Sequence, residues 1–109
     1  MAVKGAHEKI SAEVSSWEGV AALPHRFGGT EFRVGRREIG HVHVDYQVDI
    51  PFPKLIRDKL VEEHKAEPHH ILPQSGWITF RFRKLDDVEK AIELFRMSYD
   101  LSRSKLEAV

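Results

Sequence analysis

His41 and His43 are the two residues whose type and spacing most directly suggest chemistry. They alternate with Val42 and Val44, a pattern typical of a β-strand, so both imidazoles are expected on one side, within reach of one metal ion. Four residues are candidates for a third ligand, namely Asp45, Asp49, His69 and His70. A two-residue spacing without a fixed third ligand is a weak motif, because zinc sites use three or four protein ligands. We therefore interpret these histidines as surface or hydrogen-bonded residues and assign no metal and no cofactor.

Five arginines form a second group of interest, because guanidinium groups match carboxylates and phosphates. They are Arg33, Arg36, Arg37, Arg81 and Arg83. The alternative is that they pair with nearby carboxylates such as Glu31, Glu38 and Asp49. Such pairs contribute less than about 1 kcal/mol each when exposed. We favour this pairing over a shared anion site.

No catalytic residue is predicted. Ser75 lies in a predicted turn rather than in a G-x-S-x-G nucleophile elbow, and no Ser-His-Asp order is persuasive. Gly28 and Gly29 have neither a phosphate-binding motif around them nor a helix signal after them. The absence of cysteine excludes disulfides, thiolate metal sites and a cysteine nucleophile.

The elements that must position these residues follow from hydrophobic periodicity. Apolar residues three and four positions apart predict helices over residues 3–17 and 53–65. A third helix is expected to start at Asp86, an N-cap candidate paired with Glu89. Alternating polar and apolar residues predict strands at residues 31–34, 41–44, 47–50, 71–72 and 77–83. Residues 20–30 are interpreted as a connector, which gives the order α-β-β-β-α-β-β-α.

The predicted fold is a single two-layer α+β domain over residues 1–109, with helices on one face of an antiparallel sheet. Strands joined by turns this short must be antiparallel. The expected core contains Phe32, Val34, Val42, Val44, Val48, Ile50, Ile78, Phe80 and Phe82. The opposite face carries Glu31, Arg33, His41, His43, Gln47, Asp49, Trp77, Thr79, Arg81 and Arg83. Ile39 is out of phase with Val42, so Gly40 is expected to mark a β-bulge.

The polar face has two interpretations, an ordinary solvated face or a binding or dimer surface, and the second rests on tryptophan and arginine, which dominate interface anchors. The predicted binding residues are Arg33, Arg37, His41, His43, Asp49, Trp77, Arg81 and Arg83. The leading hypothesis is a binding module for a protein partner, a small anion or a second copy of the chain. Nucleic acid is a less favoured partner, since the formal net charge is +0. A small metal-dependent enzyme at His41 and His43 is the remaining alternative.

The longest apolar run is too short for a transmembrane helix or a signal-peptide core, so no membrane association is expected. Together with the absence of cysteine, this predicts a cytoplasmic protein.

Several strings spread over residues 23–101 resemble one bacterial family. These are LPHRFGGTEFRVGRREIGH, VDIPFP, AEPHHILPQSGWITFRF and SYDL. The family is of unknown function, and its members often carry the label "luciferase-like domain". The label cannot refer to the flavin-dependent barrel enzymes, which are far larger. The element order is also similar to MmcQ/YjbR-type domains, whose fold is shared with type III secretion chaperones. DNA binding has been suggested for that group, and this resemblance implies nucleic acid as a candidate partner.

Overall fold

The computed structural model of the protein describes residues 2–25 and 28–107. Its helices are α1 (Ala6–Ser15), α2 (Lys54–Glu62) and α3 (Asp86–Glu107). Its strands are β1 (Val20–Pro24), β2 (Thr30–Val34), β3 (Arg37–His43), β4 (Gln47–Pro51), β5 (Glu67–Pro68) and β6 (Trp77–Arg81). The predicted α+β class is confirmed, and the described chain holds one strand more than predicted.

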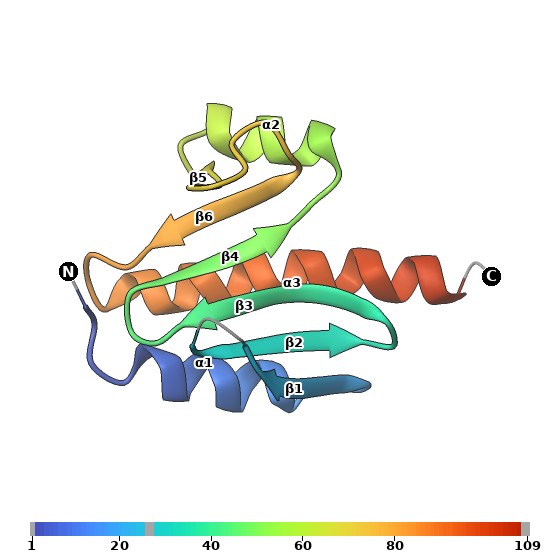
Figure 1. The fold of residues 1–109 in the computed structure, drawn as a ribbon, viewed down its shortest axis with the longest axis horizontal. Helices are drawn as coiled ribbons and strands as arrows, with labels where there is room; N and C mark the ends of the chain where they lie inside the picture. Colours follow the sequence, from blue (N-terminus) through green and yellow to red (C-terminus); the bar gives the residue numbers. More distant parts are fainter. Residues whose placement is uncertain (1, 26–27, 108–109) are drawn as a thin grey trace.

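The six strands form one open antiparallel sheet in the order β1-β2-β3-β4-β6-β5. In Figure 1, α1 and α3 lie behind the sheet and cover one of its faces. α2 packs on that same side at the β6 edge, where Ile56 and Leu60 line a groove with Phe80 of β6 and Leu94 of α3. Within residues 2–25 and 28–107 no helix covers the other face of the sheet, so its side chains are the ones available to a ligand.

The core lies between the sheet and the two covering helices. The inward side chains of β2, β3, β4 and β6 contribute Phe32, Ile39, Val42, Val48, Ile50 and Ile78, all fully buried. The rings of Phe32 and Phe95, the latter from α3, pack edge to face with their centroids 5.5 Å apart. The Tyr99 hydroxyl donates to the Glu18 carbonyl oxygen at 2.6 Å and ties α3 to the segment after α1. Within the described residues, no helix combines the length and apolarity of a membrane span.

The predicted bulge at Gly40 is confirmed. Phe32 pairs with Gly40 and Arg33 pairs with Glu38, so Ile39 is the extra residue on β3. The bulge allows both Ile39 and Val42 to be buried, although their spacing breaks strict alternation. Gly40 has φ 139°, and an added Cβ would lie 2.7 Å from Cε1 of Phe95. Only glycine fits this position without displacing the core.

Two assignments of secondary structure were wrong. Residues 20–24 form β1, an edge strand, rather than part of a connector, and β1 pairs with β2 along its whole length. The short strand expected at residues 71–72 is absent; Glu67 and Pro68 pair with β6 instead, as β5. In both cases the strand forms at a sheet edge through backbone hydrogen bonds. Proline is tolerated at an edge, and no alternation of side chains is needed there.

Two expected core residues occupy different environments. Val44 is 48% exposed and has φ 46°, because it lies in the turn between β3 and β4 rather than in the strand. Phe80 is only partly buried, because it faces the groove between α2 and α3. The remaining seven predicted core residues are buried.

Candidate functional site

Asp49 is the centre of the polar sheet face. It lies in the middle of β4, directly opposite His41 of β3 and Thr79 of β6. Its side chain is completely buried, although it points to the face without helices. A buried carboxylate costs several kcal/mol unless hydrogen bonds or opposite charge compensate. The surrounding side chains supply that compensation.

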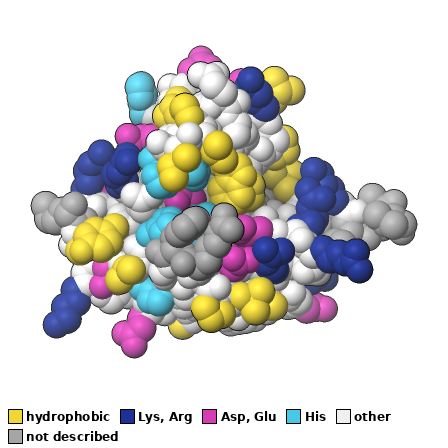
Figure 2. Space-filling view, in the orientation of Figure 1, with side chains coloured by type: hydrophobic (Ala, Val, Ile, Leu, Met, Phe, Trp, Pro, Cys, Tyr) yellow, Lys and Arg dark blue, Asp and Glu magenta, His cyan; other side chains and the backbone are white. Residues whose placement is uncertain are grey.

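Three histidines converge on one oxygen of this carboxylate. Nε2 of His43 lies 2.8 Å from Oδ2 of Asp49, Nε2 of His70 lies 3.2 Å away, and Nε2 of His41 lies 3.3 Å away. The other oxygen, Oδ1, accepts a hydrogen bond from the Thr79 hydroxyl at 2.6 Å. Histidines and carboxylates gather at the centre of the face shown in Figure 2, which is the face opposite α1 and α3. We call His41, His43, Asp49 and His70 the histidine cluster.

Glu38 and His25 support the cluster from outside. Oε2 of Glu38 lies 2.6 Å from Nδ1 of His41, and this contact orients Nε2 of that ring toward Asp49. The ring of His25, which follows β1, stacks on the His41 ring with centroids 4.1 Å apart. Because of these two contacts, the orientation of His41 is fixed on both sides.

His69 plays a different part from its neighbour His70. Its Nδ1 accepts hydrogen bonds from the backbone N–H groups of Ile71 and Leu72 at 3.1 and 3.0 Å. A neutral ring that accepts at Nδ1 carries its proton on Nε2, the atom that faces Oδ1 of Asp49 at 3.8 Å. His69 therefore holds the loop after β5 and offers Asp49 an N–H group rather than a free lone pair.

The charges of Asp49 and His41 are coupled. Burial disfavours the charged form of His41, but hydrogen bonds to Asp49 and Glu38 outweigh it and raise the pKa of His41 to about 9. Burial likewise disfavours the Asp49 carboxylate, but hydrogen bonds from His41, His43 and Thr79 hold the pKa of Asp49 well below its usual range. Asp49 is therefore ionised and His41 protonated at neutral pH.

The pKa values of two outer histidines, His25 and His69, are lowered rather than raised. Burial lowers the pKa of His69, and the nearby His70, His41 and His43 add to this effect against the attraction of Asp49. Burial also lowers the pKa of His25, with further contributions from His41 and His43. One buried carboxylate thus stabilises the positive charge of His41, while burial and the neighbouring histidines keep these two rings neutral.

The structure selects among the four candidates for a third ligand. Asp49 joins His41 and His43 in a group whose ligand atoms lie within 4.8 Å of one another, whereas His69 and His70 form a second such group with Asp49. Asp45 is used elsewhere: its Oδ1 accepts the backbone N–H of His7 in α1 at 2.9 Å. Trp77 also borders the cluster, with its ring 5.5 Å from that of His41. Sequence reasoning placed His41, His43, Asp49 and Trp77 on this face. It also placed Thr79 there but did not count it among the binding residues, and it omitted Glu38 and His25 from the site, because their contacts with His41 depend on tertiary structure.

The arginines do not converge. Arg33 pairs with Glu31, and both Arg81 and Arg83 approach Oε1 of Glu67, at 3.3 and 3.7 Å. Pairing with carboxylates was favoured from the sequence, and Arg33–Glu31 is one of the predicted pairs; Glu38 and Asp49 contact His41 instead, and Glu67 was not predicted as a partner. Arg37 lies apart from the others, on a cavity at the end of the sheet.

The Luciferase domain family matches residues 36–98. The chain belongs to this family. The matched segment runs from the start of β3 into α3 and includes the whole histidine cluster, with Glu38 and Thr79. His25 lies outside it. No curated protein and no solved structure matches the chain.

Proposed function

We propose that this Luciferase domain binds a divalent transition-metal ion through His41, His43 and Asp49. The observation that carries the proposal is that one possible ligand atom from each of these three residues lies within 4.8 Å of the other two, at the buried Asp49. Imidazole and carboxylate groups together are the ligands of zinc and of related ions such as iron, nickel and manganese. The domain would thus use its polar sheet face for binding, with the histidine cluster as the centre of that face.

The spacing of the three ligand atoms suits a small ion. Zinc bonds to nitrogen and oxygen are about 2.0–2.2 Å long, so ligand atoms of a tetrahedral site lie roughly 3.3 Å apart. Oδ2 of Asp49 is already at this separation from Nε2 of His41, and Nε2 of His43 is slightly closer. Small side-chain rotations would open the cluster around an ion.

The outer contacts are those that a metal site requires. Metal-bound histidines generally donate their second N–H to a carboxylate or carbonyl group, which fixes the ring and increases its basicity. Glu38 provides this partner for His41, and Thr79 holds the second oxygen of Asp49. Deletion of such partners typically weakens metal binding by 10- to 100-fold.

Access to the cluster is from the solvent side. The side chains of His43 and His70 are 22% and 32% exposed, whereas Asp49 is completely buried beneath them. An ion can therefore reach Asp49 beside the His43 ring, which is 22% exposed. Its arrival would release the proton of His41, because a coordinating imidazole must be neutral.

The test is a calorimetric titration of EDTA-treated protein with Zn²⁺, Ni²⁺, Mn²⁺ and Fe²⁺, each in a separate experiment. We expect one equivalent of at least one ion to bind. His41→Ala combined with His43→Ala should weaken binding by at least about 100-fold, since two of the three ligands are lost. His64→Asn is the matched control, because His64 is exposed at the end of α2, outside the cluster, and asparagine tolerates its φ of 59°.

Two results would contradict the proposal. One is the absence of saturable binding for all four ions in the unmodified protein. The other is unchanged stoichiometry and affinity in the double variant, which would place the ion elsewhere in the chain.

A further inference from the structure

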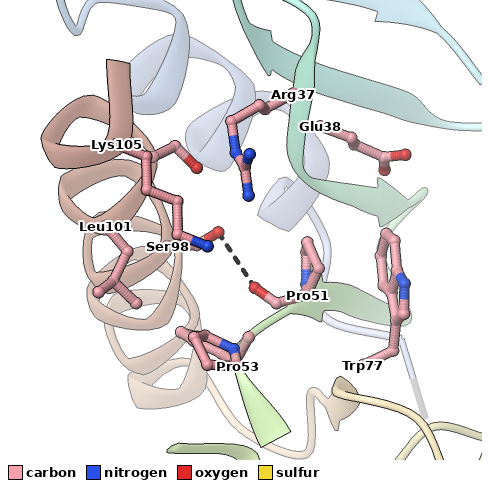
Figure 3. A pocket seen from close by; sticks show the side chains of 10 residues that line it. Arg37, Glu38, Pro51, Pro53, Trp77, Ser98, Leu101 and Lys105 are labelled. Carbon is pink, nitrogen blue, oxygen red and sulfur yellow. Dashed lines mark hydrogen bonds between the residues drawn. The ribbon is translucent and has the colours of Figure 1, made fainter. Parts of the chain in front are cut away.

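A cavity of about 400 Å³ lies at the end of the sheet, beside the histidine cluster. It opens between the start of β3, the end of β4 and the second half of α3 (Figure 3). Its lining includes Arg37, Pro51, Trp77, Leu101, Ser102 and Lys105. Its volume is within the range of small-molecule sites, roughly 300–1,000 Å³.

Two cations face this cavity without a carboxylate partner. Arg37 and Lys105 come from β3 and α3, and Figure 3 shows both side chains directed into the space between the helix and the strands. Among the residues that the structure describes, neither forms a salt bridge, in contrast to Arg33, Arg81 and Arg83. Two unpaired cations from separate elements create a local positive potential that suits an anion.

The acidic residue that lines the same cavity is already engaged. Glu38 also lines the cavity, but its Oε2 lies 2.6 Å from Nδ1 of His41. Ser102 adds a hydroxyl that has no hydrogen-bond partner within the described part of the chain, although the residue is only 7% exposed. A ligand oxygen placed between Arg37 and Lys105 would find this third donor on the same helix as Lys105.

The remaining walls are apolar. Trp77 and Pro51 face each other in the β4–β6 register, and Leu101 closes the side formed by α3. Flat apolar side chains of this kind bind the body of an organic ligand, while the few polar groups fix its orientation.

We propose that the cavity binds an organic carboxylate with a flat apolar body. Its carboxylate would lie between Arg37 and Lys105, and its body would pack against Trp77, Pro51 and Leu101. Arginine is suited to this role because its fork can donate two parallel hydrogen bonds to one carboxylate. The site is distinct from the histidine cluster and does not depend on a metal ion, although the two are neighbours through Trp77 and Glu38.

The experiment is calorimetric titration of the full chain with 2-naphthoate and with indole-3-acetate, in the presence of EDTA. We expect saturable binding of one equivalent. 2-Naphthamide has the same apolar body without the charge, and it should bind at least about tenfold more weakly, since charge-assisted hydrogen bonds are lost.

Variants locate the ligand. Arg37→Gln and Lys105→Gln should each weaken carboxylate binding by about tenfold. Both residues are exposed at the surface, so the fold does not depend on them. Arg36→Gln is the matched control, because Arg36 precedes Arg37 and is equally exposed but does not line the cavity. This variant should bind as the unmodified protein does.

Three outcomes would overturn the inference. The first is that neither carboxylate shows saturable binding up to about 10 mM. The second is that 2-naphthamide binds as tightly as 2-naphthoate, which would mean that charge is not recognised. The third is that Arg36→Gln weakens binding as much as Arg37→Gln, which would indicate attraction to surface charge in general. Because EDTA is present throughout, failure here is separate from failure of metal binding.

Discussion

The contact between the buried Asp49 and His41 determines the protonation state of the cluster when no ion is bound. Asp49 is fully buried and ionised, and His41 lies between it and Glu38. A protonated imidazole between two carboxylates keeps its proton at a pH where a solvent-exposed histidine is neutral. The apo protein therefore holds one proton in the position that we propose for the metal ion.

This proton predicts a pH dependence of stability. The pKa of His41 is raised to about 9 in the folded protein, against 6.5 in the unfolded chain. Its contribution is therefore complete below pH 6.5 and is lost as the pH rises through about 9. We expect the free energy of unfolding of the apo protein to fall by on the order of 2 kcal/mol between pH 7 and pH 9.5.

Urea unfolding at several pH values in the presence of EDTA measures this change. His25 and His69 do not disturb it, because their lowered pKa values affect stability only as the pH falls below 6.5. His41→Gln is the control and should remove most of the slope between pH 7 and pH 9.5. An equal slope in this variant would show that another group is responsible.

The bulge in β3 is the element that brings the core and the cluster into register. The extra residue Ile39 points into the core, and after Gly40 the strand places His41 opposite Asp49. A Cβ added at Gly40 would meet both Phe95 of α3 and the Asp49 carbonyl oxygen, at 2.7 and 3.0 Å. Helix packing and site geometry therefore meet at this one glycine.

Gly40→Ala should consequently destabilise the protein strongly. A Cβ at this position would lie 2.7 Å from Cε1 of Phe95 and 3.0 Å from the Asp49 carbonyl oxygen, and φ is 139°. Overpacking and an unfavourable φ together predict a loss of about 2–4 kcal/mol in the free energy of unfolding. Gly5→Ala is the matched control: φ is 84°, but no atom lies within 4 Å of the added Cβ.

Thermal or urea unfolding of both variants separates strain from overpacking. Gly5→Ala should lose only about 1 kcal/mol, the effect of positive φ alone. Similar losses in the two variants would mean that the Phe95 ring moves aside at little cost.

The elements could be predicted where side-chain pattern determines structure. The bulge could be predicted because Ile39 and Val42 cannot both face the core in a regular strand. β1 could not, because the segment VAALP pairs with β2 through its backbone, and four of its five residues are exposed. Val44 was misplaced for a related reason: alternation continues through it, but the chain has already entered a turn.

At the scale of the whole molecule, all three helices lie on one side and leave one sheet face open (Figure 1). That face could be predicted from alternation, and with it the presence of His41, His43 and Asp49. The complete burial of Asp49 and its contact with His70 could not be predicted, because the loop after β5 is placed by tertiary contacts. The same holds for the cavity, whose cations are separated by most of the chain.

The distribution of charge over the whole molecule argues against nucleic acid as the partner. Lysine and arginine number 17, as do aspartate and glutamate. Of the five arginines considered from the sequence, Arg33, Arg81 and Arg83 are paired with Glu31 and Glu67. Five arginines that each contacted a phosphate would give log K a slope of about −4.5 against log salt. The pairing removes most of this electrostatic attraction.

We therefore expect no saturable binding of a labelled DNA duplex at low salt, measured by fluorescence anisotropy. Replacing both partners, Glu31→Gln and Glu67→Gln, frees three arginines on one face and raises the net charge by two. This variant should gain weak binding with a slope of up to about −2.7 against log salt, since each phosphate contact contributes about −0.9. Tight binding by the unmodified protein with a slope near −4.5 would show that the arginines leave their carboxylate partners for phosphate. The polar face would then be a nucleic-acid surface, because exposed ion pairs of this kind are weak enough to exchange.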